Sequence, residues 1–176
     1  MQFFALPLIA EIGAALAGFA TLAGVIRHDD LDADAIFAAV FNSLIAVVFA
    51  LIAILLAGAS GSGAQSIRFA GAALLLASLV AISREVSVYR ASWRDASKTP
   101  DVQGLGSIFG IAALVTMVPP PLLAFAVVSG AFPDHAALFY ELAVFSHLLI
   151  AIFFLLYVVW RHLALRSRQR NSRTDR

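Results

Sequence analysis

The sequence predicts an all-α, polytopic membrane protein built as a bundle of five transmembrane helices. Of its 176 residues, 61% are hydrophobic and 13% are charged, which leaves too little polar surface to coat a soluble domain. The charged residues also cluster in a few short segments, and the stretches between them are almost purely apolar. This pattern is typical of membrane spans and the loops that join them.

Five apolar runs are long enough to cross a bilayer, which takes about 20 mostly apolar residues for about 30 Å of hydrocarbon. They cover residues 3–26, 36–57, 67–88, 105–129 and 136–160. Each run is too uniformly apolar for the alternating strands of a barrel, so we expect helices. The predicted organisation is a five-span domain over residues 1–160 and a basic, disordered tail over residues 161–176.

The first and third runs carry charges that a span tolerates. Glu11 costs about 3 kcal/mol at the bilayer centre, which the apolar residues of the first run offset. Arg68 and Arg84 fall near the ends of the third run and can extend to the headgroups. Tyr89 and Trp93 continue the helical spacing, so we expect the third helix to run on along the interface before Pro100.

The fourth run contains three successive prolines, Pro119, Pro120 and Pro121. Each proline lacks a backbone donor and pushes its predecessor out of the α region. We therefore expect helix four to be broken between Val118 and Leu122. Broken backbone at this depth must be buried or line a wet cavity, and a helix restarting there would favour a nearby carboxylate.

The basic residues predict the orientation. Basic side chains follow the third and fifth runs, while the segment 130–135 has none. The C-terminus is thus expected in the cytoplasm and the N-terminus outside. Half of the 12 basic residues lie in the tail, and they are Arg161, Arg166, Arg168, Arg170, Arg173 and Arg176. Directly after a span, such a block favours anionic lipid headgroups of the bilayer as partner and not nucleic acid.

The N-terminus and the composition suggest a location. The first run has no preceding basic segment and is interrupted by Glu11, so we expect it to be retained and not cleaved as a signal peptide. Arginine supplies all basic residues but one, and alanine is abundant. Both features indicate a GC-rich bacterial genome, and hence a multi-pass protein of the bacterial cytoplasmic membrane.

Motifs for chemistry were tested and rejected. Residues 30–34 begin like a calcium loop but lack its glycine and closing glutamate. Residues 58–63 are glycine-rich but lack the lysine of a phosphate loop. Ser146 and His147 are adjacent on one helix, so their side chains diverge. There is no cysteine. The sequence thus predicts no enzyme, no cofactor and no metal site, and no motif identifies a family.

Small residues predict where helices approach closely. The helix-packing candidates are Gly18 on the first run, Asn42 within an alanine-rich face of the second, and Gly106 and Gly110 on the fourth. Glu11 shares the face of Ala14, Ala15 and Gly18, so we expect both Glu11 and Asn42 to point into the bundle.

Four unusual features fall in the same half of the membrane. At 1.5 Å per residue, Glu11 and His147 reach nearly the same depth, with Glu141 and the proline run close by. The candidate intramembrane polar site is therefore Glu11, His147, Glu141, Pro119, Pro120 and Pro121. A buried Glu and His could form a structural pair, handle protons or cations, or bind a metal.

Two functions compete at this point. The first is a small, non-enzymatic accessory or scaffold component that associates with itself or with a larger membrane complex. The alternative is a proton- or cation-coupled transporter, or an ion pathway, that uses Glu11 and His147.

Overall fold

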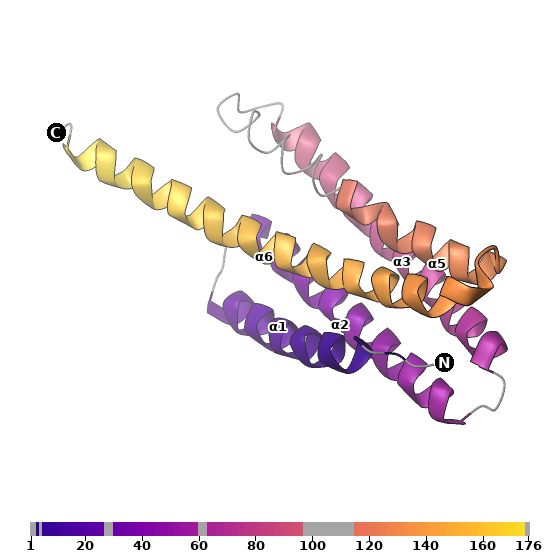
Figure 1. Ribbon diagram of the computed structural model, residues 1–176. Coiled ribbons are helices and arrows are strands. Elements are labelled where there is room, and N and C mark those ends of the chain that lie inside the picture. The colour runs from indigo at the N-terminus through magenta and orange to yellow at the C-terminus, as the bar shows by residue number, and fades with distance from the viewer. Residues whose placement is uncertain (1–2, 4, 27–29, 60–62, 97–114, 175–176) are drawn as a thin grey trace.

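The computed structural model describes residues 3, 5–26, 30–59, 63–96 and 115–174. Its helices are α1 (Leu6–Ile26), α2 (Asp30–Ala59), α3 (Gly63–Ala96), α5 (Pro119–Ser129), a short 3₁₀ helix η2 (Pro133–His135) and α6 (Ala136–Thr174) (Figure 1). No strand occurs in the described ranges. The predicted all-α class is confirmed.

Four of the helices are long and apolar enough to cross a membrane. The spanning segments are Leu6–Gly24, Ala33–Gly58, Gln65–Ser87 and Pro133–Trp160. The apolar helical segment Val115–Ser129 is shorter. These segments indicate a membrane protein, as the sequence predicts. The predicted packing glycines Gly106 and Gly110 lie outside the described residues.

The helices α2 and α6 form the centre of the bundle and pack against each other (Figure 1). On one side of this pair lies α1, which packs mainly against α2. On the other side lie α3 and α5, with α5 packed against both α3 and α6. A residue at the centre of the bundle can therefore contact three or four helices at once, whereas α1 keeps an outer face.

Small residues set the closest helix contacts. The predicted small face of α2 is buried at Ala35, Ala39, Asn42, Ala46, Ala50 and Ala53. A Cβ added at Gly13 of α1 would lie 2.9 Å from Val47 Cγ2 and 3.2 Å from the Ser43 carbonyl oxygen of α2. A Cβ added at Gly71 of α3 would lie 2.8 Å from Val127 Cγ1 of α5. These distances leave no room for a side chain.

The predicted break in helix four is confirmed. The backbone is helical at residues 115–117, bends at Val118 and resumes as α5 at Pro119. The Val115 carbonyl, which an uninterrupted α-helix would pair with the missing N–H of Pro119, instead accepts from the Val118 N–H at 3.4 Å. The three prolines form the first turn of α5, where their fixed φ suits the helix.

Several helix ends differ from the sequence prediction. The start of α2 is at Asp30, six residues before the predicted span, because the amphipathic Asp-rich segment joins the helix. As predicted, α3 continues past its span, to Ala96. The backbone of α6 stays helical to Thr174, whereas the sequence predicted a disordered tail from residue 161. Arginine is a good helix former, so the helix propagates beyond the span.

The close approach of α3 and α5 gives a stability prediction. We expect Gly71→Leu to destabilise the fold by about 2 kcal/mol or more, because the new side chain must displace Val127. The matched control is Gly58→Leu, since a Cβ there meets no atom within 4 Å. Unfolding by detergent titration in micelles measures both variants. Equal stability of the two would contradict the packing described here.

Candidate functional site

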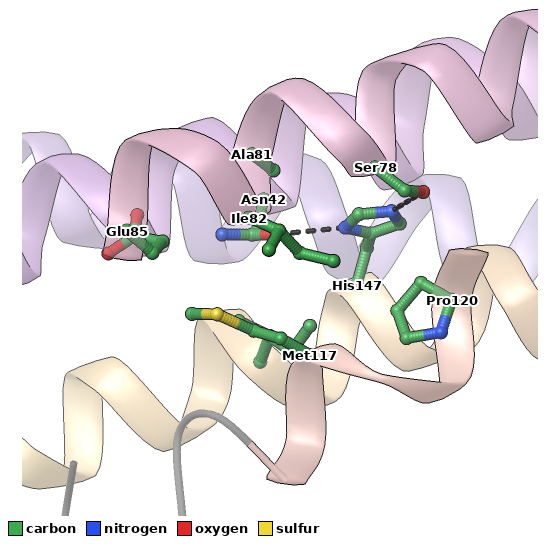
Figure 2. Close-up of a pocket in the computed structure, with 9 residues that line it drawn as sticks. Asn42, Ser78, Ala81, Ile82, Glu85, Met117, Pro120 and His147 are labelled. Carbon is green, nitrogen blue, oxygen red and sulfur yellow. Dashed lines mark hydrogen bonds between the residues drawn. The ribbon is translucent and has the colours of Figure 1, made fainter. Parts of the chain in front are cut away.

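His147 lies at the centre of the bundle and joins three helices (Figure 2). It is 1% exposed and sits near the middle of the span Pro133–Trp160. Its Nε2 lies 2.8 Å from Ser78 Oγ of α3, and its Nδ1 lies 2.8 Å from Asn42 Oδ1 of α2. Asn42 and Ser78 are buried as well. One imidazole ring therefore connects α6 to both α2 and α3.

The outer partners of the network fix how its groups are oriented. Asn42 Nδ2 donates to the Ala38 carbonyl oxygen at 2.9 Å, one turn earlier in α2. This bond places the amide oxygen toward the ring, so His147 Nδ1 must carry a hydrogen to bond with it. Ser78 Oγ donates to the Leu74 carbonyl oxygen at 2.8 Å, one turn earlier in α3. We call Asn42, Ser78 and His147 the polar triad.

A small cavity adjoins the polar triad. Its volume is about 10 Å³, roughly the room of one water molecule. Besides the triad, its lining includes Glu85 of α3, Met117 and Pro120. Figure 2 shows the Glu85 carboxylate beyond Asn42 as seen from His147. The cavity thus extends from the triad toward the end of α3.

Glu85 is held by a basic neighbour at the edge of the cavity. It is only 8% exposed, and its Oε1 lies 3.0 Å from Arg84 Nη1. The Arg84 guanidinium in turn stacks over the Phe37 ring, with Cζ 3.9 Å from the centroid. An ionisable pair therefore connects the cavity to the end of the bundle where α2 begins and α3 leaves its span.

The expectation that Glu11 points into the bundle is wrong. Glu11 is exposed, whereas Ile9, Gly13 and Ala17 form the buried face of α1. These residues recur at helical spacing and place Glu11 on the opposite side of the helix. Gly18 is exposed too, and a Cβ there would meet no atom within 4 Å, so it packs no helix inside this bundle.

The predicted match in depth between Glu11 and His147 does hold. A Cβ added at Gly13 would lie 3.7 Å from Leu148 Cδ1, so this part of α1 is level with the triad. The two side chains nevertheless point apart, and both ring nitrogens of His147 are taken by Asn42 and Ser78. The structure therefore does not bring Glu11 and His147 into one site.

Glu141 and the prolines also fall in different places. Glu141 is partly buried, and its Oε1 accepts the Ala5 N–H at 3.1 Å where α1 begins. A carboxylate does meet a positive helix end, but that helix is α1 and not the one that starts at the prolines. Of the prolines, Pro120 is buried against the cavity, Pro121 is partly buried and Pro119 is exposed.

Three residues of the site were missed by sequence reasoning. Ser78 is the one polar side chain between Arg68 and Ser83, and this isolation within a span was the available signal. Glu85 lies near the end of the third predicted run, next to Arg84, and no role was predicted for it. Tyr140 is fully buried, and its hydroxyl donates to the Phe49 carbonyl oxygen at 2.9 Å, tying α6 to α2.

No family model, no curated protein and no solved structure matches this chain. In the part of the chain that the structure describes, no three His, Asp or Glu side chains gather as metal ligands would. The features of the molecule that bear on function are the polar triad, its cavity and the outward carboxylate of α1.

The triad predicts a measurable coupling between α2 and α6. We expect Asn42→Leu to destabilise the protein by about 1–3 kcal/mol, because it leaves the buried Nδ1–H without an acceptor. In a double-mutant cycle with His147→Leu, the coupling should be about 0.6–1.7 kcal/mol, the range for polar pairs within membranes. Unfolding free energies in micelles provide the measurement.

The control cycle pairs Asn42→Leu with Ser146→Ala. Ser146 is next to His147 in sequence but bonds only within its own helix, to the Leu142 carbonyl oxygen at 2.7 Å. We expect no coupling there. Additive effects in the His147 cycle, within about 0.3 kcal/mol, would show that the triad does not link the helices.

Proposed function

We propose that this chain is a non-enzymatic accessory or scaffold component of a membrane that associates with a second copy of itself through the outer face of α1. The observation that carries the proposal is Glu11, a carboxylate at the depth of the buried triad but on the outside of the bundle. A membrane helix gains nothing by exposing such a group to lipid.

The energetics of Glu11 favour a partner from outside the chain. A charged side chain at the centre of a span costs about 3 kcal/mol on insertion scales. Among the described residues no group bonds to the Glu11 carboxylate. The cost is offset only if another molecule supplies a hydrogen bond or a countercharge, or if the carboxyl group takes up a proton.

The surface around Glu11 suits another helix. Ala14, Ala15 and Gly18 share its face, and all are exposed. Small residues on one stripe let two helix backbones approach closely. A second copy also provides complementary chemistry, because a protonated Glu11 in one copy can donate to the ionised Glu11 of the other across a two-fold axis.

We extend the proposal to five membrane passes with the C-terminus in the cytoplasm of a bacterial cell. Two observations support it. Because α3 leaves the bundle at the end opposite to that where α6 begins, the chain between them has to cross from one end to the other (Figure 1). The arginines near the C-terminal end of α3 and in the tail also follow apolar spans directly, which is the pattern expected of cytoplasmic segments.

The arrangement of Glu11 and His147 favours the accessory function over the transporter. The transporter required Glu11 and His147 to act together, and the two side chains point apart.

Cysteine crosslinking tests the association, since the chain has no cysteine of its own. We expect Ala14→Cys to form a disulfide-linked dimer in membranes under mild oxidation, because the two α1 backbones must lie within about 7 Å for this bond. The matched control is Leu79→Cys, which is also exposed and follows Ser78 of the triad, but lies on α3, on the other side of the α2–α6 pair from α1 (Figure 1). It should stay monomeric.

A second pair of variants tests the shape of the interface. Gly18→Leu should abolish the Ala14→Cys crosslink without unfolding the monomer, while Gly58→Leu should leave the crosslink unchanged; both glycines face open space in the single chain. Equal crosslinking from Ala14→Cys and Leu79→Cys, or none from either, would overturn the proposal.

Reporter fusions test the orientation. A reporter that works only in the cytoplasm should be active after Arg176 and silent when inserted between the end of α2 and the start of α3. A reporter that works only outside the cytoplasm should give the reverse. Activity of the second reporter after Arg176 would show the opposite orientation.

A further inference from the structure

The polar triad has one more hydrogen-bond contact than a neutral histidine can fill. The triad and the Leu74 carbonyl form a chain of three hydrogen-bond contacts, and each contact needs one hydrogen atom. The contacts join Asn42 Oδ1 to the ring, the ring to Ser78 Oγ, and Ser78 Oγ to the Leu74 carbonyl oxygen. Both ends of this chain can only accept a hydrogen. At one end the Asn42 amide donates its Nδ2 to the Ala38 carbonyl oxygen, so its Oδ1 faces the ring, and at the other end stands the Leu74 carbonyl oxygen. A neutral ring supplies one hydrogen and the serine hydroxyl supplies another, so one of the three contacts has no hydrogen.

A protonated ring supplies the missing hydrogen, so that all three contacts become hydrogen bonds. Its Nδ1–H donates to Asn42 Oδ1, its Nε2–H donates to Ser78 Oγ, and the Ser78 hydroxyl donates to the Leu74 carbonyl oxygen, as the structure has it. In the neutral state the hydroxyl must instead turn to Nε2. We propose that His147, with Asn42 and Ser78, forms a binding site for a single proton, and that the Ser78 hydroxyl turns when the proton binds.

The cavity gives the proton a route to the site. Glu85 lies seven residues after Ser78 on α3, so both side chains face the same way along about 10 Å of helix. The cavity that both residues line has room for roughly one water molecule. Ser78 can relay a proton that the Glu85 carboxylate gives to this water: its oxygen accepts a hydrogen from the water while its own hydroxyl hydrogen moves to Nε2, and the reverse step returns the proton. The ion pair with Arg84 keeps the carboxylate in place.

The charges around the ring come from few elements. From α3, Glu85 is the ionisable side chain that lines the same cavity, paired with Arg84. From α2 the ring contacts the neutral Asn42, while the Asp34 carboxylate of the same helix lies near enough to Glu85 for their charges to repel. The segment 115–129 has no ionisable side chain. On α6 itself Tyr140 is engaged with Phe49, and Glu11 of α1 faces away. Glu85 is therefore the carboxylate that can balance a charged ring.

The site exchanges with one side of the bundle. The residues that line the cavity lie level with the triad or toward Glu85. Toward the other end, α6 continues with the buried Val144 and Tyr140, and the Tyr140 hydroxyl is already engaged by the Phe49 carbonyl oxygen. This asymmetry favours a site that stores and releases a proton, and it goes beyond the association proposed for α1 because no step depends on a second copy.

Nitrogen NMR of the histidine ring in lipid bilayers tests the proposal on the native triad. His28, His135 and His162 are replaced by Gln so that ¹⁵N-labelled His147 reports alone. We expect the Nδ1–H tautomer at high pH and one reversible transition to a doubly protonated ring, between about pH 4 and pH 9. A ring that stays neutral throughout, or a neutral ring with its hydrogen on Nε2, would overturn the proposal, provided circular dichroism shows the helices intact.

Variants separate the proton site from ordinary structure. Ser78→Ala should weaken proton binding about tenfold, because a charged ring loses a stronger bond than a neutral one. The control Ser83→Ala removes an exposed hydroxyl of the same helix and should change nothing. Asn42→Asp, with a carboxylate against Nδ1–H, should strengthen proton binding. An unchanged transition in both Ser78→Ala and Asn42→Asp would show that the triad does not hold the proton.

Discussion

The two hydrogen bonds from the His147 ring to α2 and α3 constrain how the helices of this bundle are aligned more than any apolar contact does. Lipid tails are as apolar as leucine, so burying apolar surface does not favour one arrangement of membrane helices over another. His147 reaches Asn42 of α2 and Ser78 of α3 at 2.8 Å each, so a slide of α6 by one turn would break both bonds, and the same slide of α2 or α3 would break one. The alanine face of α2 and the glycines of α1 and α3 then allow close packing in the register that the ring sets.

The parts of the fold that depend on local chemistry could be predicted from the sequence. Run length and hydropathy predict the helices, since a backbone in hydrocarbon has few other ways to satisfy its polar groups. The break at Val118 follows from proline alone. The inward face of Asn42 follows from the alanines that share it, because no second small stripe competes for that role on α2.

The orientation of Glu11 could not be predicted by the same rule. Small residues occur on two faces of α1, one with Gly13 and Ala17 and the other with Ala14 and Gly18. Small residues identify the faces of a helix that can pack closely against another helix. They do not show which of these faces packs within the same chain. Ser78 and Glu85 were missed for a related reason: a lone serine in a span gains meaning only when its neighbour across the bundle is known. The depth of a residue can be counted along its own helix, whereas its partner depends on how the helices are arranged around each other.

The proline run at the start of α5 has a consequence for how a helix can begin in the middle of a membrane. A helix normally opens with several backbone N–H groups that need water or a capping side chain, and hydrocarbon offers neither. In α5 the first three residues have no N–H at all, and the first donor, Leu122, bonds to the Val118 carbonyl oxygen at 3.4 Å. The helix start is thus free of unpaired donors without any cap.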